Sequence, residues 1–273
     1  MKILGDYHVH SAFSADSSEA MERMVEQGMQ LGLQHICFTD HMDYDFPAQY
    51  LETEKKFEFD VDVYFDQIKK LQNTYKSDIQ IHIGVELGVK PNIVSQLEKL
   101  VTSYPFDFVI ASSHLLDNYD PYFPDYWAHI NNHSETGIRA YFQSIYENIQ
   151  AFDNFDVYGH LDYIVRYIPD PLFAYHPEQF QEEIDRILKL LIKKGKGIEI
   201  NTAGLKYGLP FAHPKEEIVT RFFDLGGSYY TVGSDAHKAE HLGYAFAEEA
   251  ITLDKLGLPA PSLFVARSII NKW

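Results

Sequence analysis

The sequence predicts an α/β protein whose parallel strands close into a barrel of roughly seven strands. Two observations support this fold class. Seven short apolar runs alternate with longer helical patterns, which favours a mostly parallel sheet with right-handed crossovers. Nearly every apolar run also ends in a histidine or a carboxylate. A barrel brings all its strand ends to one mouth, whereas an open sheet gathers only a few at its switch point, so the polar strand ends favour the barrel.

Composition narrows the class of protein. The 273-residue chain has 23 basic and 40 acidic residues, a net charge of −17 with histidine counted as neutral. Its length suits one large α/β domain or two small ones. The single cysteine excludes an intrachain disulfide and fits a reducing compartment. The sequence shows no signal peptide and no membrane-spanning apolar run, so we expect a cytoplasmic protein without a membrane partner. The acidic balance argues against nucleic acid as a partner.

The first half of the chain holds four of the predicted strands, at 3–10, 35–41, 79–87 and 106–114. Helices are predicted over 18–32, over about 60–75, and from Pro91, which is favoured in a first helical turn. We expect Ser17 or Ser18 to cap the first helix and Gly32 to end it. A loop rich in Tyr, Phe and Glu covers 44–59.

The second half holds the remaining strands, at 155–162, 197–204 and 229–237. Helices are predicted over about 135–152, 177–194, 214–225 and about 244–256. The last apolar stretch, 262–270, is compatible with either a strand or a helix. A long insertion, 115–155, follows the fourth strand, and its first part carries the aromatic residues Tyr119, Tyr122, Phe123, Tyr126 and Trp127.

The polar residues at the strand ends have the spacing of metal ligands. His8 and His10 are separated by one residue, as are Asp235 and His237, and alternate residues of a strand point the same way. Each pair can therefore face one ion. The candidate ligands, taken together, are His8, His10, Asp16, His41, Glu86, His114, His160, Asp235 and His237.

This ligand set offers imidazole and carboxylate but no thiolate, which suits Zn²⁺, Mn²⁺ or Fe²⁺. A mononuclear catalytic zinc uses about three protein ligands, so nine candidates indicate two or three divalent ions, with Glu86 as a candidate bridge. Each short motif recurs by chance, and only their joint occurrence at strand ends predicts a metal centre. The other histidines are not predicted to bind metal. We expect His35 and His82 in the core or at the surface, and we expect five histidines to be exposed: His129, His133, His176, His213 and His241.

The ordered motifs DYHVHSAFSAD, CFTDH, GVELG, ASSH, VYGHLD, EINTAG and GSDAH run from residue 6 to residue 237. As a set they resemble the PHP (polymerase and histidinol phosphatase) family, and most closely its histidinol-phosphate phosphatase branch. The resemblance implies a single-domain, distorted (β/α)7 TIM-like barrel over 1–273. It also implies a metal cluster at the C-terminal mouth, with the insertion 115–155 near the rim of the active site.

The resemblance also implies a distribution of the ligands over three ions. One ion would be held by His8, His10, Glu86 and Asp235, the second by Glu86, His114 and His160, and the third by Asp16, His41 and His237. The implied function is hydrolysis of a small-molecule phosphate monoester, L-histidinol phosphate, to L-histidinol and phosphate in histidine biosynthesis. The nucleophile would be a metal-bridging hydroxide held by Glu86, with Asp235 and His237 nearby.

Two basic residues are the implied phosphate ligands. Arg166 stands six residues after His160, and Lys206 stands where the family is expected to have arginine, so its geometry would be looser. The alternative for Arg166 is a surface ion pair with Asp162 or Asp170, and the alternative for Lys206 is a solvated side chain.

Several alternatives stay open at the level of sequence. The general acid could be Asp40, His237 or a metal-bound water. Asp117 or Asp120 with the insertion's aromatic residues could receive an imidazole and an ammonium, or those residues could pack the loop onto the barrel. Other functions are a PHP enzyme acting on a nucleotide or phosphotyrosine, an amidohydrolase-type enzyme, and a non-catalytic metal-binding protein.

Overall fold

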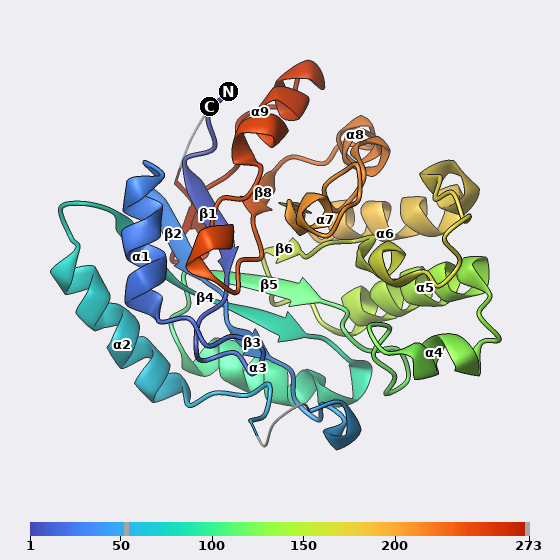
Figure 1. The fold of residues 1–273 in the computed structure, drawn as a ribbon, viewed down its shortest axis with the longest axis horizontal. Coiled ribbons are helices and arrows are strands. Elements are labelled where there is room, and N and C mark those ends of the chain that lie inside the picture. Colours follow the sequence, from blue (N-terminus) through green and yellow to red (C-terminus); the bar gives the residue numbers. More distant parts are fainter. Residues whose placement is uncertain (52–54, 271–273) are drawn as a thin grey trace.

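The structure, a computed structural model, describes residues 1–51 and 55–270. Its main sheet is parallel, with strand order β1-β2-β4-β5-β6-β7-β8 and with the short strand β3 paired to β4. The strands are β1 (Gly5–Val9), β2 (His35–Phe38), β3 (His41–Met42), β4 (Gln80–Gly88), β5 (Phe108–Ser112), β6 (Val157–Tyr158), β7 (Gly197–Asn201) and β8 (Tyr230–Gly233). Helices surround this sheet, as Figure 1 shows. The predicted α/β barrel is confirmed.

The two edge strands β1 and β8 meet and nearly close the ring. A parallel bridge joins Val9 to Ala236, just beyond the end of β8. The backbone N–H of His10 donates to the carbonyl of Ala236, and that of Asp235 donates to the carbonyl of His8, each at 2.9 Å. The buried carboxylate of Asp6 adds side-chain links, because it accepts hydrogen bonds from the backbone N–H and the hydroxyl of Ser234. The barrel therefore closes between β1 and β8, the two strands at whose ends the paired candidate ligands lie.

The helices have these bounds: α1 (Met21–Gln30), α2 (Val61–Thr74), α3 (Val94–Ser103), α4 (Pro124–His129), α5 (Ser134–Ala151), α6 (Gln181–Lys193), α7 (Ala203–Lys206), α8 (Glu216–Asp224) and α9 (Phe246–Lys255). The predicted serine cap of the first helix is wrong. Ala20 occupies the N-cap of α1 without a side-chain hydrogen bond, while the Ser17 hydroxyl donates to the carbonyl of His237. Ser17 therefore ties the loop after β1 to the barrel mouth. Gly32, with φ of +70°, follows α1 in the left-handed conformation that glycine adopts most readily.

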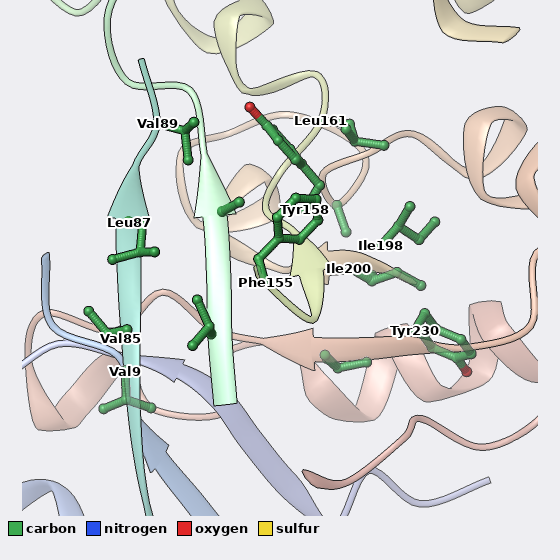
Figure 2. Close-up of a cluster of buried hydrophobic side chains, with 14 of the residues drawn as sticks. Val9, Val85, Leu87, Val89, Phe155, Tyr158, Leu161, Ile198, Ile200 and Tyr230 are labelled. Carbon is green, nitrogen blue, oxygen red and sulfur yellow. The ribbon is translucent and has the colours of Figure 1, made fainter. Parts of the chain in front are cut away.

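The alternation of side chains along the strands separates a helix-facing layer from the barrel interior. On β4, Val85 and Leu87 belong to the main hydrophobic cluster, and Glu86 between them points inwards. On β7, Ile198 and Ile200 flank Glu199 in the same way. Figure 2 shows the apolar side chains of these strands together with Tyr158 and Tyr230. Two acidic residues consequently enter the interior between apolar neighbours on their strands.

The C-terminal stretch 262–270, ambiguous in sequence, forms an antiparallel hairpin of β9 (Phe264–Val265) and β10 (Ser268–Ile269). It covers the end of the barrel opposite the strand C-termini, since Arg267 N–H donates to the carbonyl of Asp107, just before β5. The Tyr7 hydroxyl donates to the Phe264 carbonyl and accepts from the Phe264 N–H, both at 2.9 Å. An apolar cluster including Cys37 and Phe108 fills the interior at this end. The barrel is therefore plugged at its base and polar at its mouth.

Within 1–51 and 55–270, no helix combines the length and the apolar character needed to cross a bilayer.

Candidate metal centre

Glu86 lies at the centre of the barrel mouth. It is completely buried, and both of its oxygens face imidazoles. Its Oε2 lies 3.2 Å from His8 Nε2, 3.5 Å from His10 Nε2 and 3.0 Å from His41 Nδ1, and its Oε1 lies 3.2 Å from His114 Nε2 and 3.0 Å from His160 Nε2. Side chains from or just after β1, β3, β5 and β6 thus meet on one carboxylate on β4.

Two further carboxylates complete the cluster. Asp235 Oδ1 lies 3.3 Å from His10 Nε2 and 3.5 Å from His237 Nδ1. Asp16, from the loop after β1, places Oδ2 3.1 Å from His237 Nε2 and 3.6 Å from His41 Nε2. All nine candidate ligands therefore come together at the mouth.

Four groups of three residues bring one ligand atom each within 4.8 Å of one another. They are His8, His10 and Asp235; His8, Glu86 and His160; His41, Glu86 and His114; and His10, His41 and His237. The first group matches part of one implied ligand set, whereas His114 and His160 fall in separate groups that share Glu86.

The buried atoms of the centre fit a bound cation. Among the described residues, His8 Nε2, His10 Nε2, His41 Nδ1 and Glu86 Oε2 are buried and make no hydrogen bond. Each unsatisfied buried polar group costs about 1–3 kcal/mol. Divalent cations such as Zn²⁺ bind imidazole nitrogen and carboxylate oxygen, so a cation among these atoms would satisfy all of them.

The electrostatics of the centre keep its carboxylates ionised. Burial opposes the charged form of Glu86, but the neighbouring His8, His114 and His41 outweigh burial and hold its pKa well below the ordinary value. Asp235 and Asp16 behave alike: burial raises the pKa of each, and adjacent histidines lower it well below the usual range. Burial, with the charges of His237 and His41, lowers the pKa of His10. Despite burial, the neighbouring carboxylates raise the pKa of His8, His41, His114 and His237, so metal binding would release protons from these imidazoles.

Three carboxylates outside the predicted ligand set, Glu199, Asp43 and Asp40, support the candidate ligands from behind. Glu199 hydrogen-bonds His8 Nδ1 with one oxygen and accepts the His160 N–H with the other, at 2.9 Å. Asp43 Oδ2 lies 2.6 Å from His114 Nδ1. Such partners fix the orientation of a ligating imidazole. A sequence signal existed for Glu199, which occupies an inward position between two apolar strand residues.

The third supporting carboxylate, Asp40, was one of the candidates for the general acid, and the structure argues against that role. It is completely buried and does not line the cavity at the mouth. Its oxygens accept hydrogen bonds from the backbone N–H and the hydroxyl of both Ser11 and Ser14. The Ser14 hydroxyl also contacts His10 Nδ1 at 3.1 Å, so Asp40 supports the position of His10 through Ser14.

A cavity of about 480 Å³ opens above the nine residues. Its cationic side chains come from the segments after β6, β7 and β8, and they are Arg166, Lys206 and Lys238. Tyr50, Tyr122, Phe123 and the acidic Asp120 line it from the segments after β3 and β5, and further aromatic rings line it from the segments after β6 and β7, namely Tyr163, Tyr167 and Tyr207. The arginine and lysine side chains that line the cavity therefore come from one part of the ring of strands, whereas its aromatic rings come from both parts.

Arg166, on the 3₁₀ turn η3 (Tyr163–Tyr167), is held by aromatic rings. Its guanidinium carbon lies 4.7, 5.1 and 4.1 Å from the ring centres of Tyr163, Tyr167 and Tyr207. The alternative ion pairs with Asp162 and Asp170 are not formed in the described structure. Arg166 Nε is buried without a hydrogen-bond partner there, which leaves donor capacity for an anion.

Lys206 is half-buried at the cavity, so a fully solvated side chain is excluded. Its ammonium donates to the carbonyl of Asp235 at 3.0 Å and lies over the ring of Tyr207. Burial lowers the pKa of this lysine.

The remaining histidines divide between core and surface. The expected exposure is found for His129, His133 and His176, but it is wrong for His213. His213 is completely buried and pairs through Nδ1 with Asp162 at 2.5 Å, because its segment forms a two-way backbone bridge with Asn201. His241 is half-buried and lines the cavity; His35 and His82 stack on each other, with a 2.9 Å contact between ring nitrogens.

Comparison with known proteins agrees with this arrangement. A family model for the PHP domain matches residues 6–203. A histidinol-phosphatase of Lactococcus lactis is 33% identical over 269 residues, covering 97% of this chain and 95% of the relative. A probable histidinol-phosphatase of Thermotoga maritima is 32% identical over 254 residues, covering 92% and 91%.

Solved structures extend the likeness to the fold. The histidinol phosphate phosphatase of Lactococcus lactis, in complex with zinc, L-histidinol and phosphate, superimposes with a TM-score of 0.89. It is 31% identical, and the match covers 99% of this chain and 100% of that chain. A second structure, from Listeria monocytogenes, shares the fold at a TM-score of 0.77 and 21% identity, over 89% of this chain and 99% of that one. With its barrel, its ordered motifs and a family match over most of its length, the chain belongs to the PHP domain family.

Proposed function

We propose that this protein is a metal-dependent phosphomonoesterase that hydrolyses L-histidinol phosphate to L-histidinol and phosphate. The observation that carries the proposal is the combination of a nine-residue imidazole–carboxylate centre with an adjacent cavity that contains a half-buried arginine whose Nε has no hydrogen-bond partner in the described structure. The Lactococcus lactis relative, with its bound zinc, L-histidinol and phosphate, supports the choice of substrate.

The nine residues would hold two or three divalent ions, zinc, manganese or iron, with Glu86 shared between ions. His8, His10 and Asp235 would form one site, and Asp16, His41 and His237 another. His114 and His160 face the second oxygen of Glu86. Such ions, when bound, lower the pKa of water and neutralise phosphate oxygens.

The protein's own side chains position the substrate. The guanidinium of Arg166 would grip a phosphate oxygen, since it is fixed by three tyrosine rings and its Nε is free to donate within the described structure. Lys206 would add a second positive charge beside Asp235. The insertion 115–155 contributes Asp120, Tyr122 and Phe123 to the cavity wall, where the alcohol part of the ester would lie.

A substrate panel tests the proposal. With Zn²⁺ or Mn²⁺ bound, kcat/KM for L-histidinol phosphate should exceed that for glycerol phosphate, a nucleoside monophosphate and phosphotyrosine by about 100-fold or more, because buried polar groups reject an alcohol that leaves them unpaired. His8→Ala should abolish the activity. Equal or faster hydrolysis of a nucleotide would overturn the substrate, and no hydrolysis of any ester would overturn the enzymatic function.

The phosphate role of Arg166 is tested by Arg166→Lys, which keeps the charge and removes the fork. We expect kcat/KM to fall by about 10- to 100-fold, since a hydrogen bond to a charged group is worth about 1.5–3 kcal/mol. Inhibition by inorganic phosphate should weaken in parallel. Arg186→Lys is the matched control, because Arg186 lies over the Tyr146 ring on the exposed surface. Unchanged phosphate inhibition in Arg166→Lys would contradict the role.

The support that Glu199 gives to the centre is tested by Glu199→Gln. A carboxylate accepts from both His8 Nδ1–H and His160 N–H, whereas an amide accepts on only one side. Affinity for zinc, measured by competition with a chromogenic chelator, should fall by about 10- to 100-fold. The exposed Glu147→Gln serves as control. Wild-type zinc affinity in a folded Glu199→Gln variant would refute the role.

A further inference from the structure

Asp120 is an acidic side chain on the wall of the cavity that has no cationic partner in the described structure. It lies between β5 and α4, and its Oδ1 accepts the backbone N–H of Tyr122 at 2.9 Å. Among residues 1–51 and 55–270, no basic side chain forms an ion pair with it. The carboxylate therefore retains acceptor capacity on the side that lines the cavity.

The surroundings of Asp120 disfavour its negative charge. Burial, with smaller contributions from the nearby Asp43 and Asp125, raises the pKa of this carboxyl to about 6, although the Tyr122 N–H and His114 act in the opposite direction. A cation placed beside Asp120 would offset both burial and repulsion. The site is thus better suited to a positively charged ligand than to water.

Aromatic rings on the same wall of the cavity contact one another. Tyr50 stacks on Phe123 with ring centres 4.6 Å apart and an angle of 17°. Tyr122 meets Phe123 edge-on at 4.9 Å, and it meets Tyr167 edge-on at 5.6 Å. The second of these contacts leads to the arginine site, because the Tyr167 hydroxyl accepts from Arg166 Nη2. Ring contacts therefore connect the segment that carries Asp120 to the proposed phosphate ligand.

We propose that Asp120 determines specificity by pairing with the ammonium group of the amino alcohol, while Arg166 binds the phosphate of the same molecule. The inference rests on the proposed function, because it assigns the organic end of that substrate. An ester with a phosphate at one end and an ammonium beside it complements a cavity with a cationic and an acidic lining. A neutral alcohol would leave the carboxylate of Asp120 desolvated and unpaired.

Two phosphate esters, one with and one without the amine, distinguish pairing with the ammonium group from a general effect of Asp120 on activity. Asp120→Asn should lower kcat/KM for L-histidinol phosphate by about 10- to 100-fold, because it removes a charge-assisted hydrogen bond. For 3-(imidazol-4-yl)propyl phosphate, which lacks the amine, kcat/KM should stay within about twofold of the unmodified protein, as no such bond exists to lose. Asp117→Asn is the matched control: Asp117 is exposed on the same segment and does not line the cavity.

Product inhibition distinguishes a loss of ammonium binding from misfolding of the variant. Inhibition by the product L-histidinol should weaken in Asp120→Asn, while inhibition by inorganic phosphate stays unchanged. Equal losses for both esters, or unchanged inhibition by L-histidinol, would overturn the role of Asp120. If the unmodified protein did not prefer L-histidinol phosphate to its deamino analogue at all, the inference would fail. If it hydrolysed neither ester, the proposed function itself would fail.

Discussion

One buried carboxylate organises the mouth of this barrel. Glu86 is completely buried, and five histidines from four segments of the chain face it. A lone carboxylate in such a place would be protonated, because burial alone raises its pKa. The surrounding imidazoles reverse that effect, and the pKa of Glu86 falls well below its ordinary value. The strands must end at one level around β4 for this to happen, which a closed parallel barrel achieves.

The residues behind the centre connect its parts mechanically. Glu199 joins His8 on β1 to the backbone of His160 after β6, and His160 sits at a positive φ of 26°. Asp43 joins His114 to β4 by accepting the N–H of Gly88 at 2.9 Å. Buried polar networks of this kind restrict each imidazole to one orientation when all members are satisfied. Among the unsatisfied buried atoms of the described residues, His8 Nε2, His10 Nε2, His41 Nδ1 and Glu86 Oε2 belong to the centre itself.

The strand alternation and the strand-end residues made the barrel predictable, together with the clustering of eight candidate ligands at its mouth. The loop residue Asp16 was predicted from its position six residues after His10 and from the family resemblance. The supporting carboxylates were not predictable to the same degree. Asp43 lies two residues beyond a candidate ligand, and Asp40 immediately precedes the same one, yet their roles depend on contacts with Gly88 and Ser14 from other segments. Predictions made from neighbouring residues in the sequence failed where contacts with distant segments determined the structure. Ser17 bonds the barrel mouth and not a helix end, and His213 is drawn into the core by Asn201 and Asp162.

The proposed hydrolysis depends on Glu86 being shared between metal ions at the mouth of the barrel. Anomalous X-ray diffraction from crystals of the zinc-loaded protein, recorded on both sides of the zinc absorption edge, would locate these ions. We expect two or three zinc peaks among His8, His41, His160 and Asp235, with the Glu86 carboxylate contacting two of them. A single peak, or zinc bound without Glu86 as a ligand, would show that Glu86 does not bridge two ions.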